Sequence, residues 1–223
     1  MAREIELKLA VPTGAHDALI GWLDAHAKAA GSVELANVYY DTPDQALAHD
    51  HAALRVRRHG KQWLQTLKTA GDSSHAGLSA RHEWEVPLDS DALSIDAFVA
   101  NNAAEAADYV RPHADQLAPM FRTDFTRRLW HARVDGADDG EIEIALDAGA
   151  ILVPGTEARE PIDELELEWK AAAGSTLSED AIAERLHAWT RTLCTAVPGL
   201  TPLDVSKAQR GYQLRTKATG TQA

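Results

Sequence analysis

Polar and apolar residues alternate in the first stretch of the chain, which reads Arg-Glu-Ile-Glu-Leu-Lys-Leu over residues 3–9. Neighbouring side chains of a β-strand point to opposite faces, so Glu4, Glu6 and Lys8 share one face and the aliphatic residues share the other. Two carboxylates and an ammonium on one face are suited to a divalent cation and to an anion. For one strand alone, a solvated sheet face is the better interpretation. The pattern becomes informative only if later strands repeat it.

Later segments do repeat this alternation, and we predict that they are strands as well. The predicted strands cover residues 35–40, 53–58, 62–68, 81–86, 121–130, 141–147, 151–153 and 164–170. Carboxylates line one face of several of them: Glu83, Glu85, Glu141, Glu143, Asp147, Glu164, Glu166 and Glu168. Basic residues take such positions elsewhere: Arg55, Arg57, Lys68 and Arg127, with Lys207 and Arg210 near the end of the chain. The charged stripe therefore recurs strand after strand, opposite an aliphatic face.

The segments between the strands carry helix and turn signals. Helices are predicted over about 14–30 (Thr13 as N-cap, Gly31 at the end), as one or two helices within 89–119, and over 178–195 with a capping Ser178. His59-Gly60 predicts a tight turn that joins residues 53–68 into a hairpin. Residues 70–80 have the composition of a loop, which could form a mobile flap at the mouth of a barrel. Turns are also predicted at 135–140 and 148–150.

Two architectures fit the alternation. In a two-layer α+β protein, an open antiparallel sheet keeps its charges in water, which predicts a mixture of Ser, Thr, Gln and Lys on the polar face. Here carboxylates and arginines dominate that face. The second architecture is a closed antiparallel barrel of about eight strands. Its charged lumen would be stable when filled with water, metal ions and a polyanion. Periodicity alone leaves both architectures open.

Length, charge and cysteine content exclude several classes of protein. The 223 residues, 45% hydrophobic and 25% charged, suffice for one large domain or two small ones with a sizeable core. A formal net charge of −12 argues against a general nucleic-acid or membrane-surface binder, which needs a basic surface. The single cysteine, Cys194, allows no intrachain disulfide and no cysteine metal site. We find no signal peptide and no apolar run of the roughly 18 residues that span a membrane, so a cytoplasmic location is expected.

The pentapeptide Glu4-Ile-Glu-Leu-Lys8 resembles the ExExK signature of the CYTH superfamily, the triphosphate tunnel metalloenzymes. The pentapeptide alone is weakly specific, but similar motifs follow in the family's order along nearly the whole chain. They are Asn37-Val-Tyr-Tyr-Asp-Thr-Pro, Leu54-Arg-Val-Arg57, Leu67-Lys68, Glu83-Trp-Glu85, Phe121-Arg-Thr-Asp-Phe-Thr-Arg127, Glu141-Ile-Glu-Ile-Ala-Leu-Asp147, Pro161-Ile-Asp-Glu-Leu-Glu-Leu-Glu168 and Ser206-Lys-Ala-Gln-Arg-Gly-Tyr212. The spacing is most similar to that of bacterial inorganic triphosphatases. The resemblance implies one CYTH domain over 1–215 and a disordered tail or linker start at 216–223.

The resemblance also implies a fold and a reaction. The fold is α+β: a closed eight-stranded antiparallel β-barrel, or tunnel, with a polar lumen and helices packed outside. The reaction is hydrolysis of tripolyphosphate to pyrophosphate and phosphate, with Mg²⁺ or Mn²⁺ as two ions. The expected partner is a small polyanion, tripolyphosphate or a nucleotide triphosphate, and neither a nucleic acid nor a membrane. Many close relatives carry a C-terminal CHAD domain, which is therefore a candidate in a longer parent chain.

Roles for single residues follow from the resemblance together with elementary chemistry. Guanidinium and ammonium groups bind phosphoryl groups, and the expected substrate contacts are Lys8, Arg55, Arg57, Lys68, Arg127, Lys207 and Arg210. Hard divalent cations take carboxylate oxygens, and the expected metal ligands are Glu4, Glu6, Glu164, Glu166, Glu168 and Asp147. The residues expected in catalysis are Glu4, Glu6, Lys8, Arg55, Arg57, Lys68, Glu83, Glu85 and Arg127. Whether the late ligands are Glu164 and Glu166 or Glu166 and Glu168 stays open, as does the identity of the general base.

Three other functions fit the same tunnel. A class IV-type adenylate cyclase would use ATP, with attack by the 3′-hydroxyl, but the His-Phe pair of those relatives is missing here. A thiamine triphosphatase would differ in its substrate. A non-catalytic polyphosphate-binding module would keep the arginines and lose the metal carboxylates, whereas this chain has both. The sequence does not decide among these triphosphates, or between Mg²⁺ and Mn²⁺.

Overall fold

The computed structural model describes residues 3–69, 72–75, 77–134 and 139–220. Within these ranges the strands are β1 (Arg3–Ala10), β2 (Lys28–Asp41), β3 (Ala53–His59), β4 (Gln62–Lys68), β5 (Asp72–His75), β6 (Leu78–Leu88), β7 (Ala118–Ala132), β8 (Gly140–Leu152), β9 (Arg159–Ala171) and β10 (Thr201–Pro202). The helices are α1 (His16–His26), α2 (Ala46–His49), α3 (Ile95–Ala100), α4 (Ala104–Val110), the 3₁₀ helix η1 (Arg111–Gln116), α5 (Glu179–Ala196) and α6 (Lys207–Thr219).

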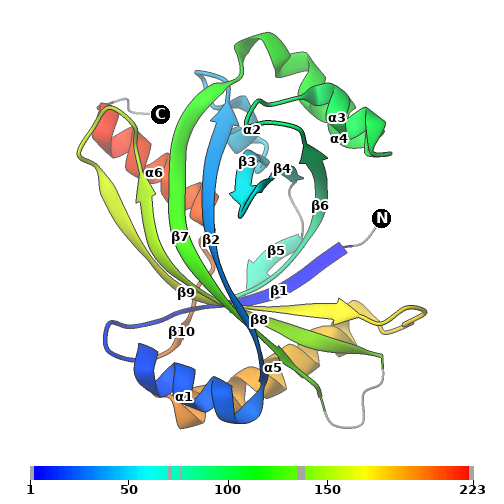
Figure 1. Cartoon of the computed structure of the whole chain (residues 1–223), viewed down its shortest axis with the longest axis vertical. Coiled ribbons are helices and arrows are strands. Elements are labelled where there is room, and N and C mark those ends of the chain that lie inside the picture. The colour runs from blue at the N-terminus through cyan, green and yellow to red at the C-terminus, as the bar shows by residue number, and fades with distance from the viewer. Residues whose placement is uncertain (1–2, 70–71, 76, 135–138, 221–223) are drawn as a thin grey trace.

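Eight of the strands close into an antiparallel barrel (Figure 1). Their order is β1-β9-β8-β7-β2-β3-β4-β6, and β6 pairs with β1 again. The closing ladder aligns Glu4 with Arg81 and Glu6 with Ser79, while on the other side of β1 the residue opposite Glu6 is Glu168. The short strands β10 and β5 extend the edges of β1 and β6. The closed eight-stranded antiparallel barrel implied by the family resemblance is confirmed, and so is the predicted hairpin of β3 and β4.

Apolar side chains cover the outside of the barrel, where helices pack on them. One cluster, with Leu7 and Ile144 at its centre, lies between the strands and the helices α1 and α5. A second cluster, with Leu54 and Leu67, lies beneath α3 and α4. Each fully buried side chain of this size stabilises the fold by about 1.5–3 kcal/mol relative to the exposed side chain. The expected apolar outer face is therefore present, and it anchors the strands that carry the charges.

Helix α6 packs differently, on the lumen side of β7, β8 and β9. Phe121 points to the same face of β7 as Arg127, and the ring of Tyr212 on α6 meets the Phe121 ring edge-on at 5.0 Å. A Cβ atom on Gly211 would come within 2.0 Å of that ring, so only glycine allows this approach. The expectation of helices outside the barrel thus holds for α1, α3, α4 and α5, while α6 closes part of the lumen.

The predicted helix over 14–30 is shorter than expected. Helix α1 ends at His26, and β2 begins at Lys28, because residues of β2 pair with β7 as far as the Lys28–His131 pair. These ladder hydrogen bonds override the helical propensity of the alanines that precede Gly31. The N-cap position is Ala15, without a side-chain cap, so Thr13 does not cap the helix. The helices expected within 89–119, and the one capped by Ser178, are confirmed.

Two other boundaries were wrong. The turn predicted at 148–150 is part of the continuous strand β8, because Gly149 serves close packing: its Cβ would lie 2.2 Å from the carbonyl oxygen of Asp124 on β7. The loop predicted at 70–80 contains the strand β5 and the start of β6, with residues 70, 71 and 76 outside the described ranges. Residues 135–138 of the predicted turn at 135–140 also lie outside them.

The two ends of the chain bear on the predicted domain limits. Residues 216–219, predicted as the start of a tail, belong to α6, and 221–223 lie outside the described ranges. The first residue that the structure describes is Arg3, in β1. In the part of the chain that the structure covers, every helix is too short or too polar to cross a membrane.

Candidate active site

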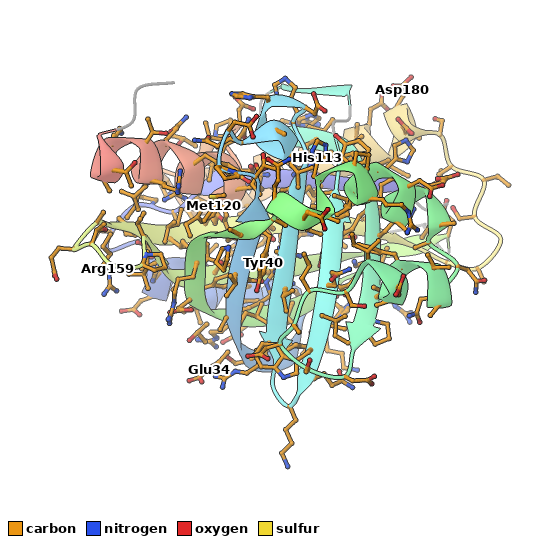
Figure 2. All side chains as sticks on the ribbon, turned by 90° about the horizontal axis from the view of Figure 1, so that it is seen from above. Glu34, Tyr40, His113, Met120, Arg159 and Asp180 are labelled. Atoms are coloured by element: carbon orange, nitrogen blue, oxygen red, sulfur yellow. The ribbon has the colours of Figure 1, made fainter. Side chains whose placement is uncertain are left out.

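A cavity of about 1410 Å³ runs into the barrel between the strands and α6. Its charged lining residues are Glu4, Glu6, Lys8, Arg55, Arg57, Lys68, Arg81, Glu83, Glu85, Arg127, Glu143, Glu166, Glu168, Lys170, Asp204, Lys207 and Lys217. Most of the residues singled out in the sequence thus face one space, because the period-two pattern turns them to one side of each strand. Figure 2 shows Glu34 and Arg159, two exposed residues, at the periphery of the molecule.

An arginine wall, formed by Arg55 and Arg57 of β3 and Arg127 of β7, faces the cavity. Arg57 makes no ion pair among the described residues, and its Nε donates to Asn37 Oδ1 at 2.6 Å. Burial lowers the pKa of Arg57 to about 9, and the charges of Arg55 and Arg127 add to the shift. Arg57 stays charged at neutral pH, in a place where positive charge is in excess. Such a place attracts an anion.

Lys68 of β4 joins two carboxylates on the next wall. Its Nζ lies 2.7 Å from Glu4 Oε2 and 3.3 Å from Glu83 Oε2, and Arg55 stands 3.7 Å from Glu83. Burial raises the pKa of the Glu4 carboxyl to about 7, and neighbouring carboxylates add to this although Lys68 opposes it. Burial would also raise the pKa of Glu83, but Lys68 and Arg55 outweigh it and hold that pKa at about 2. Near neutral pH, Glu83 is therefore ionised, whereas Glu4 is divided between its protonated and ionised forms.

Glu6 belongs to β1, and one oxygen of its carboxylate accepts hydrogen bonds from three side chains. Arg81 Nη2 donates to its Oε1 at 2.6 Å, and Lys8 Nζ and Ser79 Oγ each lie 3.2 Å from the same atom. Burial would raise the pKa of Glu6, but the charges of Lys8 and Lys68 outweigh it and hold that pKa at about 2. Glu6 is therefore an ionised carboxylate with its Oε1 directed at β6.

Lys207, the first residue of α6, occupies the centre of three carboxylates that we call the acid trio: Asp147, Glu164 and Glu166. Its Nζ lies 2.7 Å from Asp147 Oδ2 and 2.9 Å from Glu166 Oε1, and it also contacts Glu164. Burial would lower the pKa of Lys207, but the trio raises it. The helix starts there because Ser206 and Gln209 form a capping box, each side chain bonding the other's backbone N–H.

Among the described residues, the acid trio forms a group whose carboxylate oxygens lie within 4.8 Å of one another, close enough to hold a metal ion. The ammonium of Lys207 takes the place among these oxygens that we expected a metal ion to take. Arg127 adds a second cation through a two-pronged contact with Asp147, both distances being 2.7 Å. Neither Asp147 nor Glu164 is among the residues that line the cavity. The late carboxylates that do line it are Glu166 and Glu168.

Three further predicted residues remain: two of them line the cavity and the third does not. Glu168 of β9 pairs with Lys170 at 2.5 Å, and burial raises its pKa against the charge of Lys170. Glu85 accepts from Thr66 Oγ1 at 3.1 Å. Arg210 points away from the cavity lining: its Nε donates to Glu160 at 2.6 Å. The expected phosphate contact at Arg210 is therefore an ion pair that fastens α6 to β9.

Comparison with known proteins agrees with this arrangement. Residues 2–212 match the CYTH domain. The chain belongs to the CYTH family. It is 32% identical over 220 residues to an inorganic triphosphatase of Haemophilus influenzae, a match that covers 97% of this chain. The chain spans only 56% of the length of that CYTH relative.

Two solved structures share the CYTH fold of this chain. One is a Hippeastrum protein described as having a dominant triphosphatase activity, with 20% identity and a TM-score of 0.59 over 94% of this chain and 95% of that one. The other is from Pyrococcus horikoshii, with 17% identity and a TM-score of 0.59 over 94% and 98% of the two chains. At these identities the likeness is one of fold.

The donor set of this CYTH tunnel fits a hard divalent cation. Glu4, Glu6 and Glu168 offer carboxylate oxygens, which Mg²⁺ and Mn²⁺ prefer. Burial raises the pKa of Glu4 and of Glu168, so the cations already present do not offset the desolvation of these two carboxylates. A further positive charge at this wall would offset it.

Several residues that line the site were assigned no role from the sequence. Arg81 lines the cavity on the same face of β6 as Glu83 and Glu85, and the pattern of that strand places it there. Tyr39 of β2 also lines the cavity. An aromatic residue in a strand does not by itself indicate a polar lumen, so the sequence did not single it out. Tyr212 enters the site through α6, which no sequence pattern places inside the barrel.

Proposed function

We propose that this chain is the tunnel domain of a metal-dependent inorganic triphosphatase, which hydrolyses tripolyphosphate to pyrophosphate and phosphate. The observation that carries the proposal is Arg57: a half-buried guanidinium beside two other arginines, with no carboxylate partner among the described residues. A linear polyanion would supply the missing negative charge along the arginine wall. The similarity to the Haemophilus inorganic triphosphatase supports the same substrate class.

The opposite wall would hold the metal. Glu4, Glu6 and Glu168 are the ligands we favour, with Glu166 as a further one, because Lys207 already fills the acid trio. Bound Mg²⁺ or Mn²⁺, as two ions, would supply neutralisation of phosphoryl oxygens and activation of water. Lys8, Lys68 and the arginine wall would bind and orient the phosphoryl groups for in-line displacement. Water then bonds to the terminal phosphorus, the bridging P–O bond breaks, and pyrophosphate leaves.

The ion pairs of the site explain how its cations are aimed. Lys68 is held by Glu4 and Glu83, and Arg127 by Asp147. Each carboxylate fixes a cationic side chain before the substrate arrives, which reduces the ordering cost of binding. Glu83, which contacts Lys68 and Arg55, serves as such a positioning residue in this proposal, and Glu85 contributes its charge near Arg55 and Arg57. A cytoplasmic location and a CHAD domain in a longer parent chain remain predictions.

Phosphate release tests the proposal directly. Purified chain is assayed with tripolyphosphate, ATP, thiamine triphosphate and longer polyphosphate, each with Mg²⁺, Mn²⁺ or EDTA. We expect fastest release from tripolyphosphate and none in EDTA. Cyclic AMP from ATP would overturn the triphosphatase in favour of a cyclase. Binding without turnover of any substrate would instead identify a polyphosphate-binding module.

Variants of the proposed ligands test the metal wall. Glu4→Gln or Glu6→Gln removes one ligand charge and should lower turnover roughly 100-fold or more without unfolding the barrel. Glu34→Gln is the matched control, since Glu34 is exposed on the outer face of β2 (Figure 2). Wild-type turnover by both tunnel variants would refute their role as ligands.

A further inference from the structure

Asn37 of β2 is a buried polar residue that contacts Arg57, and the proposed function gives it no role. Its side chain is 1% exposed and is not among the residues that line the cavity. The strand ladders place Asn37 directly between Arg57 on β3 and Thr123 on β7. The three residues therefore form one row across adjacent strands, with the arginine at one end.

The chemistry of the two neighbours fixes which way the Asn37 amide points. Arg57 Nε can only donate, so the atom that accepts from it at 2.6 Å is the amide oxygen, Oδ1. The carbonyl oxygen of Thr123 can only accept, so the amide nitrogen faces it at 3.3 Å, and this nitrogen also donates to Thr123 Oγ1 at 2.9 Å. Thr123 is fully buried. The barrel itself thus holds the amide oxygen in place as a fixed acceptor for Arg57.

The contact with Asn37 engages only the Nε atom of Arg57. The two Nη atoms donate to no described residue, and both keep accessible surface. Since Arg57 lines the cavity, an anion in the cavity can reach them. A guanidinium that is fixed at Nε presents its Nη groups in a constant direction, which lowers the ordering cost of binding an anion.

Asn37 differs from the group that holds Arg127 on the same wall, because Asn37 is uncharged. The carboxylate of Asp147 binds Arg127 through two contacts of 2.7 Å, and it offsets the charge that it orients. The amide oxygen of Asn37 carries only a partial charge, so it orients Arg57 without neutralising it. The lowered pKa of Arg57 agrees with this, since burial and the neighbouring arginines lower it and no carboxylate in contact restores it.

We propose that Asn37 is a positioning residue, which fixes the guanidinium of Arg57 through a neutral acceptor and so leaves its charge available to the substrate. The inference rests on the proposed function, because it takes Arg57 as a phosphoryl contact. Asn37 acts only through Arg57. The substrate therefore does not compete with a carboxylate of the protein for this guanidinium. Asn37→Asp would keep the acceptor and create that competition.

Calorimetric titration with sodium tripolyphosphate in EDTA tests the inference. Asn37→Asp is nearly isosteric and should weaken binding roughly 10- to 100-fold, because the added carboxylate competes for Arg57 and repels the anion. Asn37→Leu removes the acceptor without adding a charge, and the cost of ordering the released guanidinium should weaken binding roughly 2- to 10-fold. In an Arg57→Met background, Asn37→Leu should have no further effect, because the two residues act as one unit.

Gln65→Leu is the matched control for the loss of a buried amide from a barrel strand. Gln65 is fully buried on β4, but its amide bonds the backbone of Ser94, and it is not among the residues that line the cavity. Gln65→Leu should lower the Tm, as Asn37→Leu does, and leave tripolyphosphate binding unchanged. A purely structural role of Asn37 predicts the same result for both variants.

The outcomes separate this inference from the proposed function. If Arg57→Met weakens binding while Asn37→Asp and Asn37→Leu bind like the wild type, the inference is overturned and the proposed function stands. An equal effect of Asn37→Leu with and without Arg57 also overturns it. A wild-type chain that neither binds nor hydrolyses tripolyphosphate overturns both. Thermal unfolding shows which variants are folded; should Asn37→Leu fail to fold, wild-type affinity in Asn37→Asp overturns the inference.

Discussion

Replacing Lys207 with methionine should destabilise the barrel more than any change to an exposed charge. The Lys207 side chain is 8% exposed, and two members of the acid trio, Asp147 and Glu164, are fully buried. Methionine fills a similar volume but leaves the trio with Arg127 and Arg210 as its cations. Breaking a buried ion pair by removing one partner costs about 3–5 kcal/mol. For a chain of this size that corresponds to a fall in Tm of roughly 6–20 °C.

The assay is urea unfolding in EDTA, followed by tryptophan fluorescence, at several pH values. In the wild type, burial would raise the pKa of Glu166, but Lys207 and Arg127 hold it well below its usual range. That contribution to stability is present above the unfolded pKa of about 4.3 and is lost as pH falls through the folded pKa. Without Lys207, Glu166 loses the largest charge that holds its pKa down, so the pKa of Glu166 in the folded variant rises. The deficit of Lys207→Met should therefore shrink between pH 8 and pH 5.

Lys170→Met provides the control. Lys170 also pairs with two carboxylates, Glu143 and Glu168, but its side chain is 42% exposed. We expect a loss of about 0–1 kcal/mol there because solvent screens the pairs. Equal losses from Lys207→Met and Lys170→Met, or a deficit that grows toward pH 5, would refute the reasoning. Added Mg²⁺ should stabilise Lys207→Met more than the wild type, since the trio then has room for a cation.

Two further changes test how α6 is seated in the lumen. Tyr212→Phe removes the phenol that donates to the buried Asp41 at 2.8 Å, and should cost about 1–3 kcal/mol in urea unfolding; a comparable loss from the half-buried Tyr109→Phe would contradict this. Gly211→Ala forces a methyl group against the Phe121 ring and should cost about 1–3 kcal/mol. Gly21→Ala is its helical control, with nothing within 4 Å of the new Cβ. It should stabilise the chain by up to roughly 1 kcal/mol, and the same sign of effect at both glycines would disprove the close-packing explanation.

The alternating pattern predicted which side chains share a face because side-chain direction in a strand depends only on parity, while closure of the sheet into a barrel was implied by the family resemblance. Glu4, Glu6 and Lys8 had to share a face whatever the rest of the chain did. Strand limits were harder to predict, because a closed barrel extends each strand as far as its neighbour can pair. The start of β2 at Lys28 is one case, and the passage of β8 through Gly149 is another. In both, a partner strand distant in sequence decides the backbone conformation.

The position of α6 could not be read from the sequence at all. An amphipathic helix shows which of its faces is buried, but it does not show whether that face meets the outside or the inside of a barrel. The basic segment around Lys207 was expected to bind phosphate, since arginine and lysine do so in general. The structure instead brings that lysine to three carboxylates, which a linear reading cannot place around it. The sequence therefore could not show which carboxylates surround a basic residue when they come from other elements.

The pairing of charges distinguishes the ions that are satisfied within the barrel from those that we propose to bind substrate. A buried ion is stable when its partners satisfy it, and the Lys207 group meets this condition with three carboxylates and a second cation. Arg57 does not meet it, because it has no carboxylate partner among the described residues and the charges of Arg55 and Arg127 lower its pKa further. An unpaired charge of this kind costs folding free energy, and a bound anion would offset that cost. The arginine wall around Arg57 is therefore the part of the lumen that we assign to the substrate.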